Sequence, residues 1–151
     1  MQHITKLAFI ICNIFIVFEL FTSKALAAMT IAQFQQTVKT IRATCSAKYN
    51  LSDELIDGLK KGKFIESNKE LKSYVFCVAQ MSGILSKRNE VNEQKMMSQI
   101  ENLLPEEYKD HSLTVWNACK TTQQGIPDKF DRIFKLTKCF YDVDPAKFIF
   151  P

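Results

Sequence analysis

Apolar residues recur every three or four positions through most of residues 28–151, and no stretch of four or more residues alternates convincingly as a strand would. This pattern predicts six helices joined by short polar segments. The helices are expected over residues 30–45, 52–61, 67–86, 92–104, 105–119 and 127–141, with the third ending between 86 and 89. Repeats and Pro/Ser-rich linkers are absent from this region of the sequence, so it is expected to form one all-α domain.

The helix starts carry recognisable capping signals. Thr30 is followed three residues later by Gln33, and Ser67 by Glu70, so each pair can satisfy exposed backbone amides at a helix N-terminus. The last four residues, 148–151, are apolar and carry no helix signal. We therefore expect an apolar C-terminal tail.

The first residues resemble a leader. Within residues 1–27 a basic residue, an apolar run and a small-residue cleavage site follow in the order of a secretory signal peptide. The run, residues 7–18, is interrupted by Asn13 and is shorter than the about 20 apolar residues that span a bilayer. We expect residues 1–27 to be removed and a secreted, extracellular chain of residues 28–151 to remain; the alternative is an uncleaved anchor.

Charge excludes one class of partner. The full chain has 20 basic and 16 acidic side chains, and removing the leader, with two lysines and one glutamate, leaves 18 and 15, a net charge of +3. This excess is too small to indicate nucleic-acid binding. The local cluster of Lys60, Lys61 and Lys63 is better explained as a solvated helix end, where the helix dipole favours cations.

Four cysteines remain without the leader: Cys45, Cys77, Cys119 and Cys139. They are separated by 31, 41 and 19 residues, which is too wide for a CxxC redox motif or a compact zinc site. An even number of cysteines in a secreted chain favours disulfides between helices. Four cysteines allow three connectivities, and the spacing alone does not choose among them.

The residues of catalytic sites are scarce. His111 is the one histidine outside the leader, and no nucleophile signature accompanies it. We therefore expect no catalytic residues, no metal site, no cofactor and no enzymatic activity. His111 is expected at the surface, with a pH switch as the alternative. Asn50 begins a formal glycosylation sequon, whose occupancy the sequence leaves open.

Soft and aromatic side chains are abundant. The full chain has 12 phenylalanines, and Met81, Met96 and Met97 lie close together in the third and fourth predicted helices. Methionine is flexible and polarizable, so it suits a cavity that accepts varied apolar shapes. The simpler interpretation is that these side chains fill a solid core.

The cysteine spacing resembles that of insect odorant-binding proteins of the pheromone-binding and general odorant-binding type. That family has six cysteines, with three residues between the second and the third and eight residues between the fifth and the sixth. With Cys77 and Cys139 in the third and sixth positions, the missing cysteines fall on Ser73 and Phe130. The family bonds first to third, second to fifth and fourth to sixth, so both members of one bridge are absent, as in its "minus-C" subclass. The resemblance thus implies the pairs Cys45–Cys77 and Cys119–Cys139.

Shorter similarities follow the same family along essentially the whole mature chain. They are the segment 51–56, Gly62 with Phe64, Leu71 with Lys72, and Asp131 after the absent fifth cysteine. The loss of one bridge leaves the contact between the third and sixth helices noncovalent, with Phe130 as an apolar replacement. We expect these two helices to separate more easily than the rest of the fold.

The resemblance implies six helices around one apolar cavity and reversible carriage of small hydrophobic molecules, such as odorants or pheromones, through extracellular fluid. A membrane odorant receptor is a possible downstream partner, and a monomer or weak homodimer is expected. Helical facing predicts a lining of Met81, Ile84, Met97, Ile100, Leu104, Val115, Trp116, Ile133, Phe134 and Phe150. Trp116 combines apolar area with one N–H donor for an oxygenated ligand. The rival hypothesis is a secreted helical signalling or membrane-surface protein without a ligand cavity.

Overall fold

The structure, a computed structural model, describes residues 28–151 as six α-helices followed by one turn of 3-10 helix. In chain order these are α2 (Ile31–Tyr49), α3 (Asp53–Lys60), α4 (Lys69–Met81), α5 (Glu93–Asn102), α6 (Glu106–Cys119), α7 (Lys129–Val143) and η1 (Pro145–Lys147). The described residues contain no strand, and one isolated antiparallel bridge joins Leu85 to Val91. The all-α prediction is confirmed. The predicted signal peptide, residues 1–27, lies outside the described residues.

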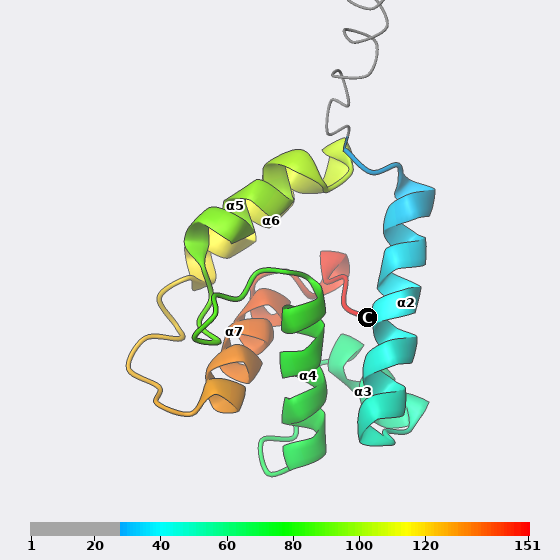
Figure 1. The fold of residues 1–151 in the computed structure, drawn as a ribbon, viewed down its shortest axis with the longest axis vertical. Coiled ribbons are helices and arrows are strands. Elements are labelled where there is room, and N and C mark those ends of the chain that lie inside the picture. The colour runs from blue at the N-terminus through cyan, green and yellow to red at the C-terminus, as the bar shows by residue number, and fades with distance from the viewer. Residues whose placement is uncertain (1–27) are drawn as a thin grey trace, which may run out of the picture.

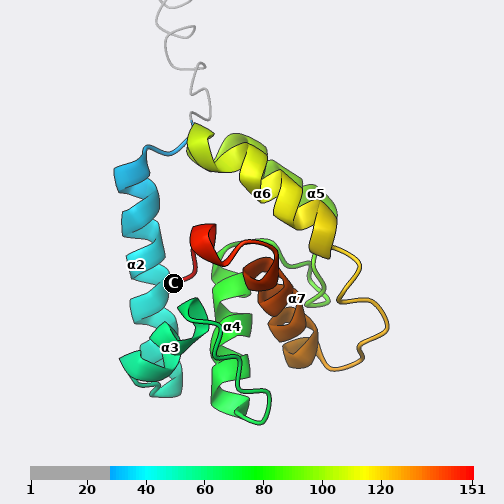
Figure 2. The same cartoon turned by 180° about the vertical axis from the view of Figure 1, so that it is seen from behind.

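The helices surround the C-terminal segment from several sides. Figures 1 and 2 show α4 and α7 next to each other, α5 and α6 paired at one end, and α2 along the side on which the chain ends. The most extensive contact between two helices is that of α4 with α7. Helix α2 packs mainly on α4, and the α5–α6 pair is joined to the rest mainly through α7.

Side-chain caps define where the helices begin. Thr30 and Gln33 form the predicted capping box at the start of α2, with the Gln33 amide donating to the Thr30 hydroxyl. The predicted cap of α4 is wrong by one residue. Asn68, rather than Ser67, accepts the amide of Leu71, at 2.8 Å, because its carboxamide reaches this orphan donor from the residue directly before the helix.

Helix α4 also ends earlier than expected. It stops at Met81, and the predicted end between residues 86 and 89 is wrong, because Gly83 has a φ of 71° that breaks the helical path. The chain then turns back on itself. Asn92 donates its amide to the Ile84 carbonyl at 2.9 Å, and Ser86 donates to the Glu90 carbonyl at 2.8 Å. Residues 84–92 therefore form a short folded loop, which we call the α4–α5 loop.

Two disulfides connect the helices. Cys45–Cys77 joins α2 to α4 and Cys119–Cys139 joins α6 to α7, with Cα–Cα distances of 5.9 and 5.8 Å. Both distances lie within the usual range for disulfide-bonded cysteines. The pairing implied by the family resemblance is confirmed. One disulfide links α2 and α4, and the other links α6 and α7.

The contact between α4 and α7 is noncovalent. The rings of Phe76 and Phe130 meet edge to face with centroids 5.0 Å apart, and Lys129 lies over both rings. Beside them Lys72 forms an ion pair with Asp131 at 2.5 Å. Phe130 therefore serves as an apolar contact to α4, while Cys139 of the same helix is bonded to α6.

Candidate functional site

The interior consists of two groups of buried apolar side chains rather than one. The first group is centred on α4 and includes residues from α2, α3, α7 and the C-terminal tail. The second group lies among α5, α6 and α7, and its buried members are Met96, Ile100, Trp116, Cys119 and Leu136. Ile84 and Val91, both in the α4–α5 loop, are only partly buried and pack against both groups. The boundary between the two groups is thus lined by side chains that keep some accessible surface.

Most of the predicted lining residues lie in these two groups. The second group contains Ile100, Trp116, Met97 and Leu104, and the first contains Ile133, Phe134 and Phe150, with Ile84 shared by both. Val115 is buried on α6 but belongs to neither group. Met81 differs from the others because it is 42% exposed. Its sulfur lies 3.6 Å from the Cys45 sulfur, beside the α2–α4 disulfide.

Accessibility separates the lining candidates from plain core residues. A side chain that lines a space open to a small molecule retains accessible surface, whereas a packed one does not. Ile133 and Phe134 are 2% and 3% exposed, so they act mainly as packing. Ile84, Met97 and Leu104 are partly accessible.

Two further partly buried apolar residues, Leu113 and Phe140, pack against the second group. They were not among the lining residues predicted from the sequence. Leu113 lies three residues before Trp116, and Phe140 lies seven after Ile133. Both positions share a helix face with a predicted residue, so helical periodicity contained the signal.

The C-terminal tail is inserted into the fold. The Tyr74 hydroxyl donates a buried hydrogen bond of 2.8 Å to the main-chain oxygen of Pro151. The Phe150 ring packs edge to face on Tyr74, and Phe148 stacks parallel to Phe150 with centroids 5.6 Å apart. Pro151 and Phe150 are both buried. Figures 1 and 2 show this segment ending next to α2.

An aromatic group holds the base of this tail. Phe64, from the α3–α4 connection, contacts Phe134, Tyr141 and Phe148. Gly62 makes this packing possible, because a β-carbon there would lie 2.7 Å from the Tyr141 ring. Its φ of 76° is also in the left-handed region that favours glycine. The pairing of Gly62 and Phe64 seen in the sequence therefore has a packing role.

Burial changes the acidity of the tyrosine that holds the tail. Desolvation raises the pKa of Tyr74 to about 12, because the phenolate would lack water in this position. Tyr74 is thus neutral throughout the physiological range. It can donate its hydrogen bond to Pro151 over all of that range.

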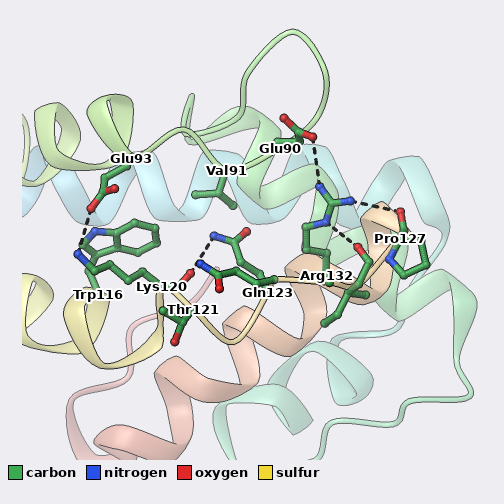
Figure 3. A pocket seen from close by; sticks show the side chains of 12 residues that line it. Glu90, Val91, Glu93, Trp116, Lys120, Thr121, Gln123, Pro127 and Arg132 are labelled. Atoms are coloured by element: carbon green, nitrogen blue, oxygen red, sulfur yellow. Dashed lines mark hydrogen bonds and ion pairs between the residues drawn. The ribbon is translucent and has the colours of Figure 1, made fainter.

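A groove opens on the surface beside the second group. It has a volume of about 740 Å³ and lies between the α4–α5 loop and the connection from α6 to α7. Figure 3 shows its side chains, with Trp116 at one end and Arg132 at the other. Its apolar lining comes from Val91, Trp116, Ile126 and Pro127.

Two ion pairs cross this groove. Glu93 and Lys120 approach to 3.2 Å at the Trp116 end, and Glu90 and Arg132 to 3.9 Å at the other. Arg132 also donates to the carbonyl of Ile126, at 3.0 Å. Each of the four charges therefore has an opposite charge across the groove, so the lining is close to neutral.

The indole N–H of Trp116 has no hydrogen-bond acceptor. Trp116 is 3% exposed, and among the described residues its Nε1 is the buried side-chain polar atom found without a partner. An unpaired buried donor is unfavourable by about 1–3 kcal/mol. The sequence singled out Trp116 as a donor, but its position between the second group and the groove was not predictable.

The remaining candidate positions are peripheral. His111 is partly exposed, with its Nδ1 3.8 Å from an Asp144 carboxylate oxygen. Asn50 is exposed and adopts a left-handed conformation at the end of α2, and Ser52 caps α3. Within residues 28–151 there is no group of three or more His, Cys, Asp or Glu side chains placed to hold a metal ion. No helix in that range is long and apolar enough to cross a membrane.

Comparisons with known proteins agree with this architecture. A model of the PBP/GOBP family matches residues 27–143. General odorant-binding protein 72 of Anopheles gambiae is 33% identical over 124 residues, covering 82% of this chain and 100% of the relative. Among solved structures, odorant binding protein 5 of Apis mellifera aligns with a TM-score of 0.74 and 22% identity, covering 82% of this chain and 99% of that one. Odorant binding protein 4 of Chrysopa pallens aligns with a TM-score of 0.73 and 25% identity over the same shares.

The six helices, two disulfides and divided apolar interior define a class of small disulfide-linked helical carriers of small ligands. Within that class, this chain belongs to the PBP/GOBP family. The family is one of carriers rather than enzymes.

Proposed function

We propose that this protein binds small apolar molecules reversibly in its interior and carries them through extracellular fluid. The observation that carries the proposal is the divided interior, in which partly accessible apolar side chains line the boundary between two buried groups. Removing apolar ligand surface from water contributes about 25 cal/mol per Å², less the cost of ordering the ligand, so affinities of about 1 μM are expected.

The binding site proposed is the boundary between the two groups. Ile84 packs against both groups, whereas Met97 and Leu104 pack against the second, and all three are partly accessible. The buried side chains of Ile100 and Trp116 in the second group and of Phe150 in the first complete the proposed lining. Ile133 and Phe134 are buried in the first group and shape the proposed site by packing. Val115, which belongs to neither group, and the exposed Met81 are peripheral to it.

A solid-cored signalling protein, the rival hypothesis, is not favoured because the chain belongs to a family of carriers. Secretion remains part of the proposal: the family match starts at residue 27, where the predicted leader ends. A downstream membrane receptor and a monomeric or weakly dimeric state are also proposed.

Displacement of the fluorescent probe N-phenyl-1-naphthylamine tests the binding site. The wild type is expected to bind the probe saturably and to release it to competing volatile ligands. Leu104→Phe should fill part of the site and weaken larger competitors more than smaller ones. Ile65→Phe is the matched control, because Ile65 is 42% exposed and belongs to neither buried group. Equal behaviour of the two variants would place the site elsewhere.

A further inference from the structure

The sequence Asn50-Leu51-Ser52 is a chemical signal that the carrier proposal does not use. It is the single Asn-x-Ser/Thr sequence of the chain, and this pattern is the acceptor for N-linked glycans in secreted proteins. It lies in the short connection between α2 and α3. So short a pattern also occurs by chance, and the surroundings of Asn50 decide whether a glycan fits there.

Asn50 is exposed, whereas both of its neighbours are partly buried. Tyr49 and Leu51 pack against the first buried group. Asn50 itself adopts the left-handed conformation, with φ 49° and ψ 41°, which asparagine tolerates better than most residues. The turn therefore buries part of the side chain on either side and leaves that of Asn50 in solvent.

The fold does not use the carboxamide of Asn50. The main-chain amides of Asn50 and Leu51 both donate to the carbonyl of Ser46, and these bonds close the end of α2. The hydroxyl of Ser52 accepts the amide of Leu55 at 3.4 Å and caps α3. A sugar on Nδ2 of Asn50 would leave both helix ends intact.

We propose that Asn50 is a site of N-linked glycosylation. The co-reactant is an oligosaccharide linked to a lipid diphosphate, supplied in the secretory pathway. Nδ2 of Asn50 forms a bond to the anomeric carbon of the first sugar, the bond from that carbon to the diphosphate oxygen breaks, and Nδ2 releases one proton. The electron pair of the broken bond leaves with the lipid diphosphate. The inference rests on the proposed function in one respect, because the chain must be secreted to meet this donor.

The sequence and the fold contribute at different stages. The transfer takes place on a chain that is not yet folded, so the sequence supplies the recognition, including the hydroxyl of Ser52. The fold then has to accommodate the attached glycan. An exposed turn does so, whereas a buried or hydrogen-bonded carboxamide would not.

A glycan at Asn50 would lie far from the α5–α6 pair. The chain before α2 is held at the end of α5, where the amide of Met29 donates to the carbonyl of Leu103 at 3.0 Å. Helix α2 has 19 residues and therefore spans about 28 Å from there to Asn50. Figures 1 and 2 show the connection between α2 and α3 at the opposite end of α2 from the α5–α6 pair. We therefore expect the glycan to leave ligand binding unchanged.

The test is secretion of the full chain from cultured insect cells, whose secretory pathway attaches N-glycans. Trypsin should release residues 49–60 as one peptide that carries the glycan. Treatment with peptide-N-glycosidase A in ¹⁸O-labelled water should convert Asn50 of this peptide to labelled aspartate, detected by mass spectrometry. This readout uses the wild type and does not depend on a variant that folds.

The variants are chosen to keep the local structure. Asn50→Gly retains a residue that favours the left-handed conformation but removes the acceptor. Ser52→Asp retains a good helix cap but destroys the glycosylation pattern, whereas Ser52→Thr keeps both the cap and the pattern. The secreted wild type and Ser52→Thr should show a gel-mobility shift that the glycosidase removes. Asn50→Gly and Ser52→Asp should lack that shift.

The outcomes separate this inference from the carrier proposal. A secreted wild type with unmodified Asn50 overturns the inference alone, as does a glycosidase-sensitive shift that persists in Asn50→Gly. A glycosylated protein that does not bind N-phenyl-1-naphthylamine contradicts the carrier proposal alone. A chain that stays inside the cells contradicts secretion, and with it both proposals.

Discussion

Single side chains in this protein have roles that sequence periodicity indicates only in part. The helical period identified Trp116 as inward-facing, and the apolar tail made Phe150 a lining candidate. Neither signal could show that Nε1 of Trp116 is unpaired or that the tail reaches Tyr74. Those contacts join residues far apart in the chain, and no local pattern encodes them. The cap of α4 illustrates the limit of local rules, since two adjacent residues, Ser67 and Asn68, both have suitable side chains.

The helix cap gives a prediction with a built-in control. Asn68→Ala should lower the free energy of unfolding by about 1 kcal/mol, because the Leu71 amide loses its acceptor. Ser67→Ala should change it by less than about 0.5 kcal/mol, because Ser67 is exposed and does not cap the helix. Urea unfolding of both variants measures the difference, and a larger effect at Ser67 would contradict the observed cap.

The raised pKa of Tyr74 leads us to expect that the folded protein loses stability in alkali. Its pKa is about 12 in the folded protein and about 10 when unfolded, so the unfolded state loses its proton first as the pH rises. This contribution is fully present below pH 10 and decreases as the pH rises from about 10 to about 12. Unfolding measured against pH should show that decrease in the wild type relative to Tyr74→Phe. Parallel pH profiles for the two proteins would contradict the assignment.

At the scale of whole elements, the sequence predicted the number and order of the helices and, through the family resemblance, both disulfides. It failed at the end of α4, where apolar residues continue the helical period while Gly83 turns the chain. The loop that follows carries Ile84 and Val91 to the boundary between the two buried groups. Periodicity cannot show such a turn, because it reports which residues are buried and not where the backbone leaves the helix.

The noncovalent contact between α4 and α7 should be the first to open. Phe130→Ala removes the ring that meets Phe76 and is expected to destabilise the fold by about 1–3 kcal/mol. Amide hydrogen exchange should then accelerate in α4 and α7 before it does in α2 and α6, their disulfide partners. Protection in α4 and α7 as deep as elsewhere, in both wild type and variant, would contradict this expectation.

The disulfides should stabilise according to the loops they close. Their sequence separations of 32 and 20 residues correspond to about 3–4 kcal/mol each in the chain-entropy model. Replacing Cys119 and Cys139 together by serine should therefore lower the unfolding free energy by about 3 kcal/mol. Replacing Cys45 and Cys77 together by serine should lower the unfolding free energy slightly more, because that bridge closes the longer loop. A reversed order would show that strain or residual structure in the unfolded state outweighs loop length.

At the scale of the whole molecule, the fold places two buried groups side by side and inserts an apolar tail between helices. Where the two groups meet, the partly buried Ile84 and Val91 pack against both. The sequence predicted a carrier because its cysteine spacing and several shorter segments resemble one family of carriers. The division of the interior and the groove at Trp116 depend on tertiary packing and required the structure.

Calorimetric titration of the wild type with N-phenyl-1-naphthylamine at several temperatures tests the carrier function most directly. A carrier should bind one probe molecule per chain at about micromolar affinity, with a negative heat-capacity change because apolar surface leaves water. Heats that do not saturate, or binding without a negative heat-capacity change, would contradict an apolar ligand site in the interior.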